Sequence, residues 1–523
     1  MSDLERESKR EERKVRSERR IIAKRTDTGC DFYLPDYMGD IKRIIHYCAS
    51  VLPAGQYESD GSVSFSGVVA YSVIYLDGEN RLQEAAFTSD FELNCQVGEG
   101  FIKASCKNDI SALAVRAAGA RKISAKASVS TEAYVIEEVA IPPLDYGVSL
   151  EKRTRNIKIH TPEYAEPCEV EYAERGRLLA GIGAEEVETV MSFGKARVTD
   201  AKLEEGKIRL SCEINAGCLV RVLGEEYVRI DKVIPTEVIL DCPDGFTESD
   251  ISAEARLASI SIGVSNDVNE EGEAGASVVF NVVCEYSARL DTNEEYEVIT
   301  DAFATGKRCE YTYKELDFDE HLYTSTSKHT EIMKLGKEAN GAQSLPKEVL
   351  FSDVKARQTS MKLEGTDALV EGELAVTLIC LNENGAGYTT LKETYPFTVK
   401  QRVDLKGGAD IECAIDTGVL DVNITEDIEM SVDVYLTVTA RRKCRLTALC
   451  EVREKTPRDD TATENCFVAY YPKDKDTLWE VAKRYGVPVN EIAIANELSV
   501  STSADSTNEN LLAGVKMLLI KSI

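Results

Sequence analysis

Histidine is the side chain most often used for acid–base and metal chemistry near neutral pH, and this chain has four, at positions 46, 160, 321 and 329. None of them belongs to an H-E-x-x-H motif, and the chain has no G-x-x-x-x-G-K-[ST] phosphate loop and no G-x-S-x-G nucleophile elbow. Gly181-Ile182-Gly183 lacks the third glycine of a dinucleotide-binding turn. The sequence therefore predicts a chain that is not an enzyme, with no catalytic residue and no cofactor.

A metal site is considered only around His321 and His329, where Asp317, Asp319 and Glu320 offer further ligands. The two histidines are 8 positions apart in a stretch rich in Thr and Ser, and that spacing fixes no ligand geometry. We expect a solvated linker here and no metal site.

Paired carboxylates could also do glycosidase chemistry, and 91 acidic residues provide many chance pairs. Most of them alternate with apolar residues, as at Glu371, Glu373, Glu429 and Asp433. Such alternation is typical of the solvent face of a half-buried strand, so we interpret these acids as surface residues.

The charge and the cysteines limit the partners and the compartment. The 62 basic residues against 91 acidic ones give a net charge of −29, the wrong sign for binding nucleic acid or anionic lipid. The 15 cysteines include no C-x-x-C pair, and several lie in apolar alternating runs, as Cys212 and Cys380 do. We expect free, buried thiols in a reducing compartment.

The first 28 residues are expected to form a charged N-terminal arm. Met1–Arg25 contains no apolar core of a signal peptide, and no apolar run is long enough to cross a membrane. The pairs Glu5 with Lys9 and Glu12 with Arg16 have the i, i+4 spacing of an exposed helix. These features predict a cytoplasmic protein that is not secreted and has no transmembrane segment.

A β-hairpin pattern occurs three times in the chain. The predicted hairpins are Val63–Leu76 with Arg81–Cys95, Ile208–Val222 with Tyr227–Leu240, and Ala368–Leu381 with Tyr388–Val399. Further strands are expected after each hairpin, at Phe101–Ala117 and Ile123–Val135, at Ile251–Val264 and Ala276–Arg289, and at Ile411–Val422 and Ile428–Thr439. The sequence predicts a mainly β chain of tandem antiparallel sandwich-like domains.

The expected domain order follows from these repeats and from polar or proline-containing boundaries. It is an arm at 1–28, β-domains at 29–150 and 151–318, a linker at 319–346, a third β-domain at 347–455, and a small domain at 466–523.

The small domain has the order strand, helix, helix, strand. Helical periodicity starts at Leu478, Gly486 is a plausible stop, and a second short helix follows Pro488. Thr477 and Glu480 have the spacing of a capping box, and Trp479 is expected to pack in the core.

The segment Tyr470–Val487, with Glu491, Asn496, Leu512 and Gly514, resembles a LysM domain, a module generally associated with N-acetylglucosamine-containing glycans. Lys475 replaces the usual glycine, and the stretch 501–508 after Asn496 is longer than in most members. The resemblance implies a binding groove formed by Asp476, Thr477, Leu478 and Asn496.

The β units resemble the SPOCS domain of spore-coat-associated, SipL-like proteins, in which tandem copies precede a LysM domain. The matching segments are Leu34–Ile44, Ala118–Ala127, Ile299–Phe303 and Tyr311–Leu316. The resemblance implies a spore-coat assembly scaffold on the mother-cell side of the developing spore surface. Its partner would be a spore-coat morphogenetic protein such as the coat basement-layer ATPase.

Two other functions are considered. The LysM-like domain could bind peptidoglycan glycan directly, or it could target a cell-wall enzyme. A recognisable catalytic domain is missing for the second of these.

Overall fold

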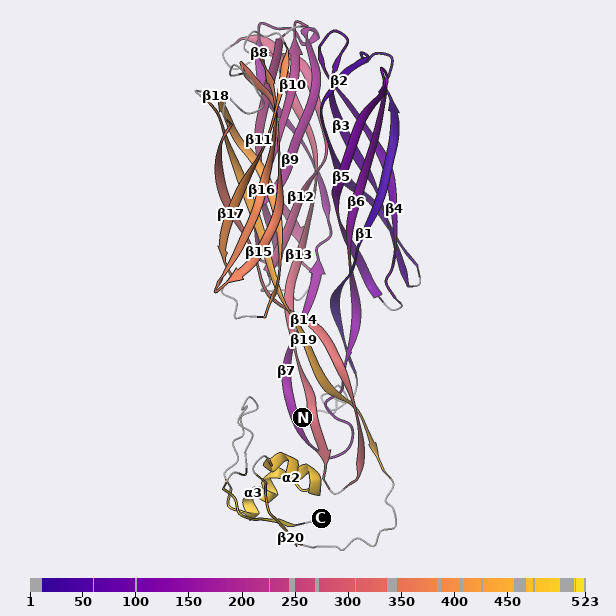
Figure 1. The fold of residues 1–523 in the computed structure, drawn as a ribbon, viewed down its shortest axis with the longest axis vertical. Helices are drawn as coiled ribbons and strands as arrows, with labels where there is room; N and C mark the ends of the chain where they lie inside the picture. The colour runs from indigo at the N-terminus through magenta and orange to yellow at the C-terminus, as the bar shows by residue number, and fades with distance from the viewer. Residues whose placement is uncertain are drawn as a thin grey trace.

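The computed structural model describes residues 12–59, 61–98, 101–224, 226–243, 250–268, 272–305, 307–335, 346–382, 387–403, 408–424, 427–455, 467–473, 476–498, 512 and 514–521. Within these residues the chain is mainly β, as predicted, with two short helices near the C-terminus. Three bundles of strands form a head, long strands continue from the head as a stem, and the small C-terminal domain lies at the far end of the stem (Figure 1).

The first sandwich has two three-stranded sheets, ordered β2-β3-β4 and β1-β6-β5. Its strands are β1 (Arg13–Tyr33), β2 (Ile41–Ser59), β3 (Ser62–Asp77), β4 (Leu82–Gln96), β5 (Phe101–Gly119) and β6 (Lys122–Ile141).

The second sandwich pairs the sheet β9-β10-β11 with a sheet in which β13 lies between β12 on one edge and β7 and β8 on the other. Its elements are β7 (Leu150–Tyr164), β8 (Cys168–Ala180), the 3₁₀ turn η1 (Ala184–Glu186), β9 (Val187–Glu204), β10 (Lys207–Val222), β11 (Glu226–Asp241), β12 (Asp250–Val268) and β13 (Ala274–Ala304).

The third sandwich has the sheets β15-β16-β17 and β14-β19-β18. Its strands are β14 (Cys309–Leu335), β15 (Glu348–Glu364), β16 (Asp367–Leu381), β17 (Tyr388–Arg402), β18 (Asp410–Ile424) and β19 (Ile428–Glu454).

All three sandwiches have the same strand order, so the chain is a threefold structural repeat. In the first and third, one unbroken strand (β1 or β14) pairs with the last strand of the unit along nearly its whole length. In the second, the equivalent strand is divided into β7 and β8, with Pro167 in the gap between them. Proline has no N–H to donate to a sheet ladder, which explains the break at this position.

The three predicted hairpins are confirmed as β3/β4, β10/β11 and β16/β17. Each supplies the middle strand and one edge strand of a three-stranded sheet. Alternate residues of the middle strands are buried, as at Ile208, Leu210 and Ile214 of β10, which pack in one cluster with Val278 and Phe280 of β13. The period of two therefore places one face of each sheet in a sandwich core.

The sandwiches also pack against one another, in part through their hairpin sheets. A shared apolar cluster forms where the three hairpin ends meet and contains Ile45, Ile74, Leu76, Leu82, Met191, Leu219, Tyr227, Leu350, Phe351 and Ile379. The backbone N–H of Leu82 donates a 3.0 Å hydrogen bond to the Tyr227 hydroxyl, which links the first sandwich to the second. The Tyr227 and Tyr388 rings meet edge to face at 5.9 Å and link the second to the third.

The stem consists of the ends of long strands that leave the sandwiches in pairs: β1 with β6, β7 with β13, and β14 with β19. Its upper part has a small apolar core that includes Val15, Ile141, Ile159, Val298 and Phe318. One core thus receives side chains from all three repeats, and this contact holds the pairs together.

Two predictions about connecting segments are wrong. Residues 319–335 of the predicted linker belong to β14, because they pair with β19 down to Leu335 opposite Ile428. The predicted helix of the arm is instead strand β1 from Arg13 onward, because pairing with β6 buries Val15 at 2% exposure. Glu12 and Arg16 therefore do not lie on a helix, and the pair Glu5 with Lys9 lies outside the described residues.

The small domain has the predicted order, with β20 (Phe467–Tyr470), α2 (Leu478–Tyr485), α3 (Val489–Ala495) and β21 (Leu518–Lys521). The two strands pair antiparallel, and the helices pack on one face of them. Among the described residues no helix has the length and apolar character needed to cross a bilayer. None of the 14 described cysteines forms a disulfide bond.

Candidate functional site: the C-terminal domain and its contact with the stem

The predicted groove begins at the first turn of α2. Thr477 caps this helix: its Oγ1 accepts a 3.2 Å hydrogen bond from the Glu480 N–H, and the Glu480 carboxylate accepts one from the Thr477 N–H. This is the predicted capping box. Thr477 is 2% exposed, so its hydroxyl already serves the fold of the domain.

Asp476 holds the loop before α2. Its Oδ2 accepts hydrogen bonds from the backbone N–H of Lys473 at 2.8 Å and from the Tyr470 hydroxyl at 2.5 Å. These donors stabilise the carboxylate and lower the pKa of Asp476. The side chain is nevertheless solvent-accessible, so it remains a possible contact for a ligand.

Leu478 and Asn496 have structural roles in the same domain. Leu478 is 2% exposed in the domain core. The Asn496 amide joins α3 to β21, because its Nδ2 donates to the carbonyls of Ile492 and Leu519 and its Oδ1 accepts from the Leu519 N–H. The four groove residues thus lie around the two ends of the helical pair, and their role in binding stays a prediction. Residues 474, 475 and 499–511, which would complete the groove, lie outside the described residues.

The C-terminal domain is joined to the end of the stem by side-chain contacts. The Trp479 Nε1–H donates a 2.7 Å hydrogen bond to Oδ2 of Asp301, at the stem end of β13. Lys483, one turn further along α2, forms an ion pair with Oδ1 of the same carboxylate. One aspartate therefore holds two successive turns of the helix.

Apolar and aromatic contacts complete this junction. Phe303 of β13 belongs to the core cluster of the C-terminal domain, and its ring meets Trp479 edge to face at 5.0 Å. The Arg153 guanidinium lies 4.7 Å from the centre of the Trp479 ring. Trp479 is in the core, as predicted, but part of that core is supplied by the stem.

The electrostatics of Asp301 favour the docked arrangement. Burial by itself would raise the pKa of Asp301, but hydrogen bonds from Lys483 and Trp479 outweigh burial and lower it. The ionised carboxylate is therefore the form that the junction stabilises.

Asp301 and Phe303 were not predicted as part of this junction. Both fall in the segment Ile299–Phe303 that was singled out only as a family resemblance. No spacing rule connects position 301 with position 479, because the contact depends on where the stem ends.

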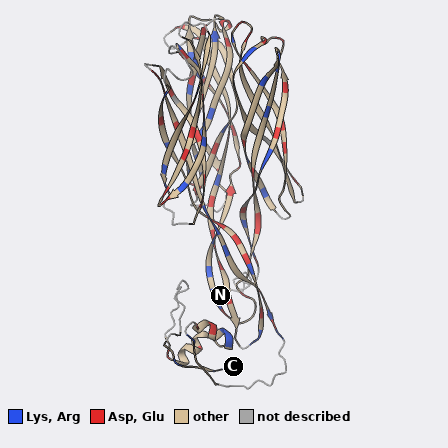
Figure 2. Cartoon of the chain, viewed as in Figure 1, with Lys and Arg blue, Asp and Glu red and all other residues tan. Residues whose placement is uncertain are grey.

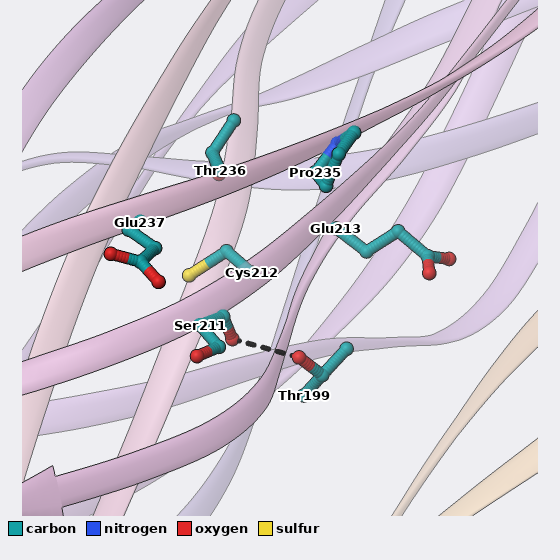
Figure 3. Close-up of a pocket in the computed structure, with 7 residues that line it drawn as sticks. All are labelled: Thr199, Ser211, Cys212, Glu213, Pro235, Thr236 and Glu237. Atoms are coloured by element: carbon teal, nitrogen blue, oxygen red, sulfur yellow. Dashed lines mark hydrogen bonds between the residues drawn. The ribbon is translucent and has the colours of Figure 1, made fainter.

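The second sandwich also has a shallow hollow on its surface. It is lined by Thr199, Ser211, Cys212, Glu213, Pro235, Thr236 and Glu237, on strands β9, β10 and β11 (Figure 3). Thr199 donates to the Ser211 carbonyl at 3.0 Å, and burial raises the pKa of Cys212 to about 12. A thiol with that pKa is protonated at neutral pH and is a poor nucleophile.

The charged residues that the structure describes are of mixed sign in the view of Figure 2. Acidic and basic residues are interspersed along the strands of the head and the stem (Figure 2). Many of them form exposed cross-strand pairs, such as Lys207 with Asp241 and Arg445 with Asp317.

Comparison with known proteins identifies the C-terminal domain. A family model of the LysM domain matches residues 473–502, which include α2 and α3. The protein is thus a mainly β chain with a LysM domain near its C-terminus. Comparison with curated proteins and with solved structures gives no match for this chain. The SPOCS resemblance of the sandwiches gains no support from these comparisons and stays a hypothesis.

Proposed function

We propose that this chain is a non-enzymatic assembly scaffold in which the LysM domain is an adaptor held at the end of a stiff stem. The observation that carries this proposal is the junction of Asp301 with Trp479 and Lys483. Because it anchors the domain to a head built from three packed sandwiches, a partner bound at the LysM end would be held at a defined distance from the head.

A protein partner for the LysM domain is supported by an apolar stripe on the outer face of its sheet. Phe467 is 64% exposed and Leu519 is 39% exposed, and they are diagonal neighbours across the pair β20/β21. Tyr471, the residue after β20, is 69% exposed. Exposed apolar side chains grouped on one face are typical of an interaction surface.

The proposed setting is the mother-cell cytoplasm at the developing spore surface. It rests on the SPOCS resemblance. The partner would be a spore-coat morphogenetic protein, with the coat basement-layer ATPase as the first candidate. Many copies with weak contacts would build a layer through avidity.

A second candidate function is glycan binding, and the match to the LysM family favours it. In this case the ligand would be an N-acetylglucosamine-containing glycan of peptidoglycan, bound near Asp476 and the loop after Asn496.

One pair of binding experiments separates the two. Full-length protein is assayed for binding to the purified ATPase and for co-sedimentation with peptidoglycan sacculi. ATPase binding that is lost in Phe467→Ser/Leu519→Ser and kept in the control Tyr57→Ser, on the head, supports the protein adaptor. Sedimentation that soluble chitooligosaccharide abolishes supports the glycan function. Binding to neither ligand by folded protein contradicts both proposals.

A further inference from the structure

A buried group of metal-ligand side chains lies where the second and third sandwiches join the stem. His160 of β7, Asp291 of β13 and His321 of β14 each offer a ligand atom, and these atoms lie within 4.8 Å of one another. The three side chains, called the neck cluster below, are 1%, 2% and 6% exposed. The solvated linker predicted around His321 is therefore wrong at this residue.

Each histidine of the neck cluster lies beside a carboxylate. The Nε2 of His160 lies 2.7 Å from Asp291 Oδ1, and the Nε2 of His321 lies 2.8 Å from Asp250 Oδ2. The Nδ1 atoms of both rings are buried and have no hydrogen-bond partner. For His321, the Asp250 carboxylate at Nε2 fixes the tautomer and strengthens Nδ1 as a ligand. For His160, Nε2 and the neighbouring Asp291 oxygen offer the ligand atoms.

The strand register brings two aspartates together at the neck cluster. Asp250 and Asp291 are directly opposite each other in the β12/β13 ladder. Like charges in that position destabilise a sheet unless positive charge lies nearby. In β14 the register shifts between His321 and Tyr323, and such bulges re-aim side chains.

The charged groups around the neck cluster carry a net negative charge. The carboxylates of Glu18, Asp250 and Asp291 are accompanied by the guanidinium groups of Arg289 and Arg441. With neutral histidines, these groups are one positive charge short. Arg289 and His160 both contact Asp291 at Oδ1.

We propose that the neck cluster binds one Zn²⁺ through His160, His321 and Asp291. Two imidazoles and one carboxylate are a ligand set that suits zinc. The ion would tie β7, β13 and β14 together at the root of the stem, so its role would be structural: it would fix the direction of the stem and of the LysM domain relative to the head.

The first test uses full-length protein stripped with chelator and then dialysed against zinc. We expect one zinc per chain by elemental analysis and a melting temperature several degrees higher than in EDTA, because an ion that binds only the folded state stabilises it. Cobalt(II) in place of zinc should give ligand-field bands without the thiolate charge-transfer band that binding by cysteines would produce. Absence of bound zinc, or a thiolate band from the bound cobalt, would overturn the proposal.

Substitutions of the proposed ligands test where the zinc binds. His160→Gln and His321→Gln should each lose the bound zinc. The matched control is His46→Gln, because His46 is also buried beside a carboxylate, Asp353 at 3.4 Å, but lies outside the neck cluster. If the histidine variants do not fold, Asp250→Asn is tested instead. The Asp250 side chain is 41% exposed, so its replacement should leave the fold intact. Loss of this outer contact should weaken zinc affinity about 10- to 100-fold. Unchanged affinity in Asp250→Asn contradicts the site.

Discussion

The Trp479 indole of the LysM domain donates its N–H to the Asp301 carboxylate across 2.7 Å, although the two residues are 178 positions apart. This hydrogen bond, with the Lys483 ion pair and the Phe303 ring, makes the end of the stem a part of the LysM core. Trp479 is also the single tryptophan of the chain, so its fluorescence reports on this junction alone.

We expect Asp301→Asn to loosen the LysM domain from the stem. The substitution removes the ion pair with Lys483 and replaces a charged hydrogen-bond acceptor with a neutral one. A hydrogen bond to a charged group contributes about 1.5–3 kcal/mol. Trp479 emission should therefore shift to longer wavelength as the indole meets water. Asp317→Asn, at an exposed carboxylate of the stem that pairs with Arg445, is the control and should leave the emission unchanged.

The same junction should persist through mildly acidic pH. The pKa of Asp301 is lowered in the folded state, so its contribution is complete above the usual aspartate value of about 3.9 and is lost as pH falls through the lowered value. Trp479 emission should be constant from neutral pH to about pH 5 and should change only below about pH 4. A midpoint near pH 6 would mean that another group controls docking.

Thr477→Ala should destabilise the LysM domain without affecting the head. Loss of an N-cap costs about 1 kcal/mol, in a range of about 0.5–2. Thermal unfolding followed by Trp479 fluorescence should shift to lower temperature, whereas the β-sheet signal of the head in circular dichroism should keep its midpoint. Glu480→Gln is the control, because glutamine can replace glutamate in a capping box.

Tyr227→Phe should weaken the contact between the first two sandwiches. The change removes the acceptor of the Leu82 N–H and leaves that buried donor without its partner. An unsatisfied buried donor costs about 1–3 kcal/mol, which should appear as a lower free energy of unfolding in urea. Tyr57→Phe, at an exposed residue of the first sandwich, should have no measurable effect.

The buried thiols should be unreactive in the native protein. Burial raises the pKa of Cys212, Cys218 and Cys380 to about 12 in each case, so little thiolate is present at neutral pH. A thiol reagent at pH 7 should modify these three cysteines only after denaturation, as peptide mapping would show. Rapid native labelling of any of them would contradict the core packing described above.

The local pattern of residue types was sufficient to predict the hairpins and the C-terminal domain. Alternation of apolar residues in Ile208–Val222 predicted a strand buried on one face, and the spacing of Thr477, Glu480 and Gly486 predicted where α2 begins and ends. These features depend on neighbours within a few residues, and such neighbours are visible in the sequence.

The segments whose structure was predicted wrongly are those that pair with strands far away in the sequence. Residues 319–335 are polar and read as a linker, but β19 supplies the hydrogen bonds that make them a strand. The charged residues after Arg13 read as a helix, but β6 pairs with them over the length of β1.

A mainly β chain with three similar units and a LysM-like domain thus follows from the residue pattern alone. The packing of the units around one cluster, the contact of Asp301 with Trp479, and the convergence of His160, Asp291 and His321 are visible only in the folded chain. These contacts join residues more than 20 positions apart, through the register of long strands and, for Asp301, through the packing of α2 against the end of β13. That register is fixed by the burial of whole sheet faces and by no local pattern.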